Sequence, residues 1–508
     1  MPGLCRASRY NHAFPYKGEM LLFNGLSSAL TVLPCPVFEQ VESYLFTAQP
    51  FDPESVGDPG LRTTLEGLRS GRFFLDADTD EVRYLRRRSE LHKTKHPMSL
   101  TVATTMDCNL GCYYCFEEKY KSYMDDETCD LIYEYARREM EKETPGTLYV
   151  TWFGGEPMLN PGAIERLSAK LIALCAARGV KYAGNMISNG TTWPETAEEI
   201  SAFVLRNRIM HVQFTFDGLP HNHNKRRRYV SPGAELSSFD AMARTISALV
   251  GATRMTFRMN CDPDSVKDLF GLVDLFVERG WLYPGSGTYP YAARIRPATE
   301  TCDFVQNHMV EYSEFNQLNN RFLRYVAQFM DAREIAELIY PKAVKVGCDA
   351  VNPRGMMFGP DGMLYRCTED MGDHKRSHGH IREKLRMMDA AKLLPILGNG
   401  FANAGSLVND YENFDPHSQS ACSVCKYLPQ CMSGCPKDQL EKQRRANENR
   451  ANTDAFKQYW DDSLGPLITM YADLTIGREG QSAPSEAQTS FDEYLANMRQ
   501  ESVRVGMS

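Results

Sequence analysis

The sequence predicts an α/β fold in which helices wrap a parallel sheet that is either open or closed into a barrel. Three observations support this fold class. Apolar, β-rich runs alternate with segments of helical spacing through the middle of the chain. Unusual polar groups fall where predicted strands end, as expected for a site built on the loops that follow parallel strands. A small α+β segment precedes this region, and a cysteine-rich segment follows it.

The predicted strands of the central region are short apolar runs with β-forming residues. They cover residues 98–105, 147–155, 181–190, 210–218 and 254–262. Between them, apolar residues recur at helical spacing, which predicts helices. The predicted helices cover residues 126–142, 161–179, 195–208 and 264–280.

The first 95 residues predict a small α+β module ahead of the central region. Residues 17–34 form two apolar runs around Asn24-Gly25, a dipeptide typical of a hairpin turn. A helix is predicted at 37–45, and residues 61–93 predict a helix, a short extended wing and a second helix.

Composition limits the class of protein before any motif is considered. The 508 residues suffice for two or three domains, and no run approaches the roughly 18 apolar residues of a membrane-spanning helix. The N-terminus lacks the pattern of a secretory signal, which favours the cytoplasm. In that compartment fifteen cysteines indicate metal or redox chemistry rather than disulfides. The formal net charge of −8 disfavours a nucleic-acid partner.

Three cysteines, Cys108, Cys112 and Cys115, lie within eight positions in "CNLGCYYC", directly after a predicted strand. A structural zinc site needs four ligands, whereas a cubane iron-sulfur cluster held by three thiolates leaves one iron open. The motif therefore favours an iron-sulfur cluster. A zinc site and a chance grouping of core cysteines stay open as alternatives.

Six further cysteines follow in a turn-rich region with little apolar periodicity. Two of them bracket a predicted hairpin at 359–366, and the other four lie in "CSVCKYLPQCMSGC". Ligation of metal or clusters would hold such a segment together. These six residues are Cys348, Cys367, Cys422, Cys425, Cys431 and Cys435.

The motif "CNLGCYYC" resembles the radical SAM signature. The resemblance implies a partial (β/α)6 TIM-like barrel, a [4Fe-4S] cluster on the three cysteines, and S-adenosylmethionine bound to the open iron. It places Tyr114 near the adenine. "WFGGEP" resembles the family's GGE motif, in which Gly154, Gly155 and Glu156 bind the methionine ammonium.

Two later strand ends extend this resemblance. "ISNGT" is similar to the element that contacts the ribose and the methionyl carboxylate, which implies roles for Ser188 and Asn189. "FDGLPHNHNKRRRY" resembles a further family stretch and aligns Asp217 and Arg227 with cofactor contacts. Arg227 is expected to pair with the cofactor's carboxylate, although the neighbouring arginines leave the register open by one. Taken alone, the arginine run would be a solvated charged surface and Asp217 part of a turn.

The six late cysteines resemble the SPASM extension, which holds two auxiliary iron-sulfur clusters in peptide-modifying radical SAM enzymes. The family's crossed arrangement implies that Cys348, Cys367 and Cys435 serve one cluster and that Cys422, Cys425 and Cys431 serve the other. The protein would then hold three [4Fe-4S] clusters. No cysteine follows Cys435 and none lies shortly after Cys348, so three thiolates are expected for each auxiliary cluster, with a distant cysteine, an oxygen or nitrogen ligand, or an open iron at the fourth position. An alternative places all four cysteines of 422–435 on one cluster.

The resemblance implies a peptide maturase that cleaves S-adenosylmethionine to a deoxyadenosyl radical and installs an oxidative cross-link, a thioether or a carbon-carbon bond. Residues 15–95 resemble a winged precursor-recognition domain that binds a leader peptide, although a structural cap is an alternative. A sulfatase-maturase-like enzyme forming formylglycine is a second reading, weakened by Thr368 where that class has an aspartate. The third reading is a non-catalytic iron-sulfur electron carrier or sensor. No general base is assigned.

Four domains are expected: a precursor-recognition-like module (1–95), the radical SAM core (96–330), the SPASM domain (331–440) and a helical tail (441–508). The expected partners are a precursor peptide with a leader and an electron donor such as flavodoxin or ferredoxin. Among the other cysteines, Cys129 and Cys175 are predicted to be core residues. Cys261 is expected at a strand end facing the site.

Overall fold

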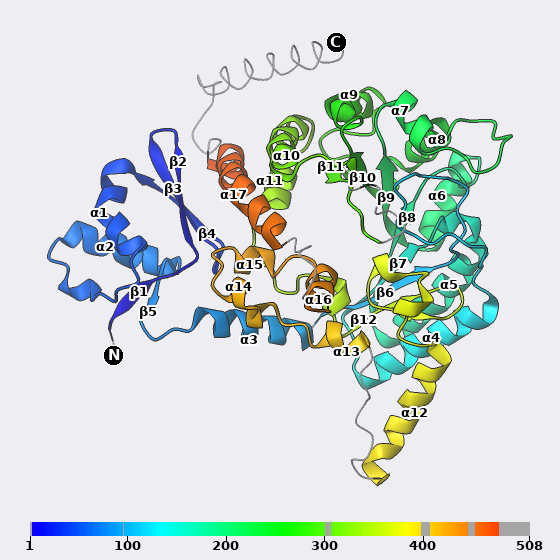
Figure 1. Ribbon diagram of the computed structural model, residues 1–508, viewed down its shortest axis with the longest axis horizontal. Helices are drawn as coiled ribbons and strands as arrows, with labels where there is room; N and C mark the ends of the chain where they lie inside the picture. Colours follow the sequence, from blue (N-terminus) through cyan, green and yellow to red (C-terminus); the bar gives the residue numbers. More distant parts are fainter. Residues whose placement is uncertain are drawn as a thin grey trace.

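The structure is a computed structural model that describes residues 3–94, 96–299, 305, 307–397, 407–444 and 453–476. A β-rich N-terminal module lies at one end of the molecule, and a large mixed α/β body lies at the other (Figure 1). Helices from the C-terminal third of the chain lie between them. Within the described residues, no helix is long and apolar enough to cross a membrane.

The body is built on one eight-stranded sheet with the order β11-β10-β9-β8-β7-β6-β12-β13. Six of its strands run parallel in sequential order, as a (β/α)6 arrangement requires. They are β6 (Met98–Ala103), β7 (Thr147–Phe153), β8 (Lys181–Ser188), β9 (Ile209–Phe216), β10 (Arg254–Cys261) and β11 (Thr288–Arg294). The first five confirm the predicted strands. The sequence did not reveal β11, which contains Pro290 and is mostly half-buried.

Helices connect and cover these parallel strands. They are α4 (Asp126–Lys142), α5 (Pro161–Arg178), α6 (Ala197–Arg206), α7 (Pro220–Arg226), α8 (Ser238–Leu249), α9 (Leu269–Glu278) and α10 (Tyr312–Val326). The four predicted helices correspond to α4, α5, α6 and α9. Their ends follow local chemistry: Thr196 and Glu199 form a capping box at the start of α6, and α5 ends at Gly179 with a positive φ.

The core between sheet and helices is apolar and rich in aromatic rings. Phe216 lies at its centre, with its ring centroid 4.7 Å from that of Phe276 and 5.1 Å from that of Phe257. Cys129 and Cys175 are buried in the same core, which confirms their prediction. Burial of this apolar surface stabilises the sheet that carries the site.

The N-terminal module is a three-stranded antiparallel sheet with helices on one face. Its strands are β2 (Asn11–Tyr16), β3 (Glu19–Asn24) and β4 (Ala29–Pro34), and a short pair joins β1 (Cys5–Ala7) to β5 (Phe74–Asp76). Its helices are α1 (Cys35–Leu45), α2 (Pro59–Ser70) and α3 (Glu81–Thr94). The hairpin and the helix-wing-helix order are confirmed, whereas β2 was not predicted because its sequence is polar and contains Pro15.

The cysteine-rich part extends the main sheet. The predicted hairpin forms as β12 (Gly355–Phe358) and β13 (Leu364–Tyr365), and β12 pairs in parallel with β6. The helices of this part are α11 (Ala332–Ile339), α12 (Ile381–Leu397), α13 (Leu407–Glu412), α14 (Ser420–Ser423), α15 (Leu428–Cys431) and α16 (Pro436–Arg444). Short 3-10 turns include η2 (Pro157–Leu159), η7 (Thr368–Asp370) and η8 (His374–Arg376).

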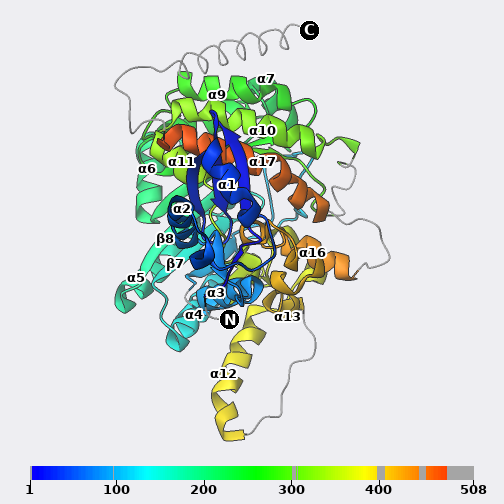
Figure 2. The same ribbon diagram turned by 90° about the vertical axis from the view of Figure 1, so that its left-hand side faces the viewer.

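The last described helix, α17 (Thr453–Thr475), belongs to the tail that was expected to be helical, 441–508, and lies across the face of the N-terminal sheet. Leu464 and Ile468 of α17 pack against Phe23 of β3, and the view toward the module shows β2 and β3 in front of this helix (Figure 2). The end of the tail, 477–508, lies outside the described residues.

Candidate active site

The loop after β6 carries the three clustered cysteines at the carboxyl end of the parallel sheet. All three are half-buried and free of disulfides. Two backbone hydrogen bonds tie this loop to the segment after α7: Gly111 N donates to Arg228 O at 2.8 Å, and Val230 N donates to Asn109 O at 2.9 Å. Distant parts of the sequence therefore fix the position of the loop.

Lys119 lies four positions after Cys115. Burial lowers the pKa of Lys119, but the charges of the three cysteines and Glu117 raise it overall. Its Nζ also donates to the Leu110 carbonyl. Burial raises the pKa of the Cys108 thiol to about 11 and that of Cys115 to about 12. Thiols buried beside a fixed cation are suited to bind a metal cluster as thiolates.

Two glycines press the end of β7 against the cysteine loop. Gly155 N donates to Thr105 O at 3.1 Å, and Glu156 N donates to Asp107 O at 3.0 Å. A Cβ on Gly154 would lie 2.1 Å from Thr105 O, and one on Gly155 would lie 2.3 Å from Asp107 O. No larger residue fits this approach, which explains the pair of glycines before the glutamate.

Glu156 is fully buried beneath this loop, where Oε1 accepts from Ser188 Oγ at 2.9 Å and Oε2 accepts from Asn189 N at 2.6 Å. Burial raises the pKa of its carboxyl to about 7. Asn189 Nδ2 reaches the cysteine loop at Asn109 Oδ1, 2.8 Å away. The structure thus brings Ser188 and Asn189 together with the GGE motif.

Residues at the ends of β9 and α7 also lie beside the cysteine loop. Tyr114 Oη donates to Asp217 Oδ2 at 2.6 Å and accepts from Arg227 Nη1 at 2.7 Å. Arg227 is only 7% exposed, and its Nε has no hydrogen-bond partner within the described residues. Arg226 instead pairs with Asp262 at 2.9 Å, and Arg228 is exposed. Of the three adjacent arginines, Arg227 therefore faces Tyr114 and the cysteine loop.

Residues at the end of β10 were only partly anticipated. Asn260 Nδ2 donates to Asp217 Oδ1 at 3.0 Å, while Asp262 accepts from Tyr113 and Arg226. Cys261, between them, is buried in the apolar core, so the expectation that it faces the site is wrong. Side chains alternate along a strand, which turns Cys261 away when Asn260 points inward. The polar strand end "NCD" was the signal that could have identified Asn260 and Asp262.

Five of the six late cysteines pack beside apolar clusters: Cys348 and Cys367 beside one, Cys425 and Cys431 beside a second, and Cys422 beside a third. Cys348 and Cys367 pack beside Tyr411. Burial raises the pKa of the Tyr411 hydroxyl, and the charges of Cys367 and Cys435 raise it further. Burial raises the pKa of Cys431 to about 11, with further contributions from Cys422 and Cys425. The assignment of these cysteines to two cluster-binding sets stays a prediction.

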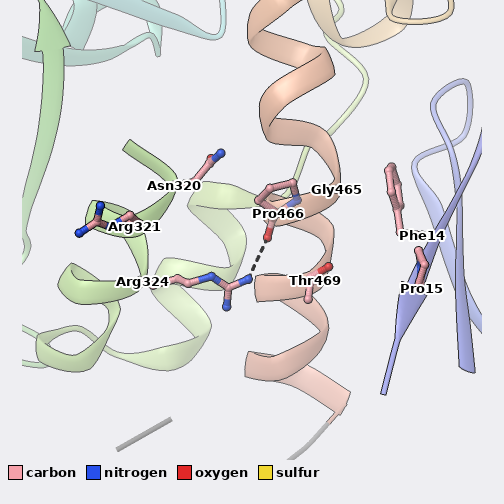
Figure 3. Close-up of a pocket in the computed structure, with 8 residues that line it drawn as sticks. All are labelled: Phe14, Pro15, Asn320, Arg321, Arg324, Gly465, Pro466 and Thr469. Carbon is pink, nitrogen blue, oxygen red and sulfur yellow. Dashed lines mark hydrogen bonds between the residues drawn. The ribbon is translucent and has the colours of Figure 1, made fainter. Parts of the chain in front are cut away.

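A cavity of about 700 Å³ lies between the cysteine loop and the segment after Cys367. Phe116 and Tyr120, which follow Cys115, line one side, and Glu369 and residues 371–376 line the other. A second hollow, of about 460 Å³, lies between β2, α10 and α17 (Figure 3). Neither cavity is lined by a predicted site residue. The first cavity lies beside the segment after Cys115 and the segment after Cys367.

Comparison with known proteins agrees with this geometry. Residues 102–246 match the family model described as the Radical SAM superfamily. These residues therefore form a radical SAM domain.

Two solved structures share the fold at low sequence identity. The chain resembles native anSMEcpe with bound AdoMet and Kp18Cys peptide, with 16% identity, a TM-score of 0.53, and coverage of 74% of this chain and 100% of the other. It also resembles native anSMEcpe with bound AdoMet, with 17% identity, a TM-score of 0.52, and coverage of 75% and 100%. Streptococcus suis SuiB bound to precursor peptide SuiA matches with 13% identity and a TM-score of 0.47, covering 86% of this chain and 97% of the other.

Proposed function

We propose that this protein is a radical SAM peptide maturase that installs an oxidative cross-link, a thioether or a carbon-carbon bond, on a ribosomally made precursor peptide. The supporting observation is the 700 Å³ cavity, because it is lined on one side by Phe116 and Tyr120, which follow Cys115, and on the other by residues that follow Cys367. A peptide side chain in this cavity would lie between a radical source and an electron acceptor. That arrangement suits oxidation of the substrate.

The residues of the first site fit a [4Fe-4S] cluster and S-adenosylmethionine. Cys108, Cys112 and Cys115 would hold three irons, and the cofactor would take the fourth. The buried Glu156 carboxylate would bind the methionine ammonium, and the unpartnered Nε of buried Arg227 suits a carboxylate. When bound, this pair supplies a deoxyadenosyl radical that removes a hydrogen atom from the substrate.

The remaining predicted contacts belong to the same proposal. Tyr114 would pack near the adenine, with Asp217 orienting its hydroxyl at 2.6 Å. Ser188 and Asn189, which now bind Glu156, would share their polar groups with the ribose and the methionyl carboxylate. The glycines at 154 and 155 would keep Glu156 against the cluster loop.

Two auxiliary [4Fe-4S] clusters would receive the second electron of the oxidation. Cys348, Cys367 and Cys435 would bind one of them, and Cys422, Cys425 and Cys431 the other. The grouping of these thiols around Tyr411 and around Cys431 supports this division. A flavodoxin or ferredoxin in the cytoplasm would supply electrons to the first cluster.

The N-terminal module is proposed to bind the leader of the precursor as an added strand. β4 pairs with β3 on one side, and no other described strand pairs with its outer edge. The opposite edge strand, β2, contains Pro15, which lacks a backbone donor. β4 is therefore the better edge for a leader peptide.

Formylglycine formation is the second candidate, supported by a fold shared with anSMEcpe, whose structure holds a bound Kp18Cys peptide. The position after Cys367 is Thr368, which cannot act as a carboxylate base. A non-catalytic electron carrier would not need a buried glutamate held against the cluster loop by two glycines.

The test is mass spectrometry of a candidate precursor peptide after anaerobic reaction with the reconstituted enzyme, S-adenosylmethionine and a reductant. A cross-link removes two hydrogen atoms from the peptide, whereas conversion of cysteine to formylglycine removes sulfur. The control is the triple variant Cys108→Ala, Cys112→Ala, Cys115→Ala, which should form no deoxyadenosine. Deoxyadenosine from this variant would contradict the assignment of the first site.

A further inference from the structure

We propose that Glu369 supplies the fourth protein ligand to the auxiliary cluster held by Cys348, Cys367 and Cys435. This inference rests on the proposed function, since it requires that cluster to exist. Three thiolates are assigned to it above, and a cubane cluster has four irons. A fourth ligand must therefore come from another side chain, from the substrate or from solvent.

Glu369 lies where such a ligand is needed. It follows Cys367 by two positions within η7, the turn that Cys367 itself begins. Lys437, two positions after Cys435, donates from Nζ to the Glu369 carbonyl at 3.3 Å. This contact joins the Cys367 turn to the start of α16, which directly follows Cys435.

The charge of Glu369 affects all three thiols. Burial is the main cause that raises the pKa values of Cys348, Cys367 and Cys435, and the charge of Glu369 contributes to each increase. Glu369 is the acidic residue common to all three. Its side chain is 17% exposed, so it is largely withdrawn from water.

The two carboxylate oxygens of Glu369 differ in their partners. Arg296 Nη2 donates to Oε1, which fixes the orientation of the group. Oε2 is buried and has no hydrogen-bond partner within the described residues; the nearest cation, Lys437 Nζ, lies 3.6 Å away. A buried oxygen without a hydrogen bond is costly unless it binds something, and an iron would satisfy it.

The neighbouring carboxylate, Asp370, does not offer the same opportunity. Its Oδ1 pairs with Lys437 at 3.0 Å and with Arg376 at 3.4 Å, and its Oδ2 accepts from Tyr411 at 3.1 Å. Both of its oxygens are therefore engaged. Glu369 also lines the 700 Å³ cavity, so the iron it would bind faces the proposed substrate.

The test uses the full chain carrying the triple alanine replacement of Cys108, Cys112 and Cys115, so that only auxiliary clusters load. After anaerobic reconstitution this parent should hold about eight irons per chain. Iron content near zero would refute the proposed auxiliary clusters themselves, independently of Glu369. EPR and Mössbauer spectra are then compared between this parent and two variants, Glu369→Gln and Glu369→Cys.

The inference expects both variants to change the spectrum of one cluster and leave the other cluster unchanged. Glu369→Cys should retain about eight irons per chain, and the affected cluster should show the spectrum of a cluster with four thiolate ligands. Glu369→Gln should either show a changed spectrum for that cluster or lose its roughly four irons. Asp373→Asn is the matched control, because Asp373 lines the same cavity and should leave both spectra unchanged. Spectra of both variants identical to the parent, or loss of one cluster from both, would overturn the inference.

Discussion

The replacement Gly154→Ala tests whether the close approach of β7 to the cysteine loop holds the site together. Gly154 has a φ of +123°, a conformation that strains any residue with a side chain by about 1–3 kcal/mol. The added Cβ would also lie 2.1 Å from Thr105 O, so the backbone must shift to avoid overlap. Overpacking of this kind costs about 1–3 kcal/mol more.

Together these terms predict that Gly154→Ala lowers the free energy of unfolding by about 2–6 kcal/mol. Urea denaturation followed by tryptophan fluorescence measures this, since Trp152 lies buried in β7 two residues before the change. Iron content after reconstitution should fall as well, because the cysteine loop is displaced from Glu156.

The matched control is Gly162→Ala, in the first turn of α5, where an added Cβ meets nothing within 4 Å. Helix propensity predicts that this change is neutral or stabilises by up to about 1 kcal/mol. If Gly154→Ala unfolded like Gly162→Ala and bound the same amount of iron, the proposed role of the approach would be refuted.

Four further predictions concern the site and the module. Arg227→Met should weaken binding of S-adenosylmethionine at least about tenfold, because it removes one charge-assisted hydrogen-bonded pair. Equilibrium dialysis measures this affinity, and the control Arg228→Met, at an exposed residue, should leave it unchanged. Because the folded pKa of Glu156 is raised to about 7, the cofactor-free protein should lose up to about 3 kcal/mol of stability as pH rises from about 4.5 to 7. Urea denaturation across this range should show that slope in the wild type, and an equal slope in Glu156→Gln would contradict the burial argument. Cys261→Ala should keep the full iron content, since that thiol is buried in the apolar core; iron loss would contradict this placement. A precursor without its leader should bind more weakly than the full peptide in fluorescence anisotropy, and equal affinity would favour a capping role for the module.

The sequence predicted the elements whose signals are local. Five strands, four helices of the body and the hairpin after Asn24-Gly25 follow from side-chain periodicity and turn residues. The missed strands, β2 and β11, each contain a proline and few buried positions, so their pairing depends on neighbours rather than on pattern. Pairing of β12 with β6 joins residues more than 250 positions apart, which periodicity does not encode.

The sequence motifs pointed to candidate site residues, but they did not show how the side chains of these residues are oriented. The strand-end motifs identified Glu156 and Tyr114, and the structure adds the hydrogen bonds that join them to Asn189 and Asp217. The choice of Arg227 over its neighbours depends on the register of α7, which a run of three arginines does not define. The place of Glu369 depends on contacts with Arg296 and α16, which are distant in the sequence.

The pairing of β12 with β6 bears on how the two cysteine regions act together. The loop of Cys108 leaves the end of β6, and Cys367 follows β13, the strand that pairs with β12. Both regions therefore extend from one hydrogen-bonded sheet, and buried residues of that sheet, including Ala103, Met357 and Tyr365, pack in one apolar cluster between them. Because one sheet carries both cysteine regions, no domain movement is needed to bring the two regions together. The peptide, rather than the enzyme, would then supply the motion needed to place its reacting side chain in the cavity.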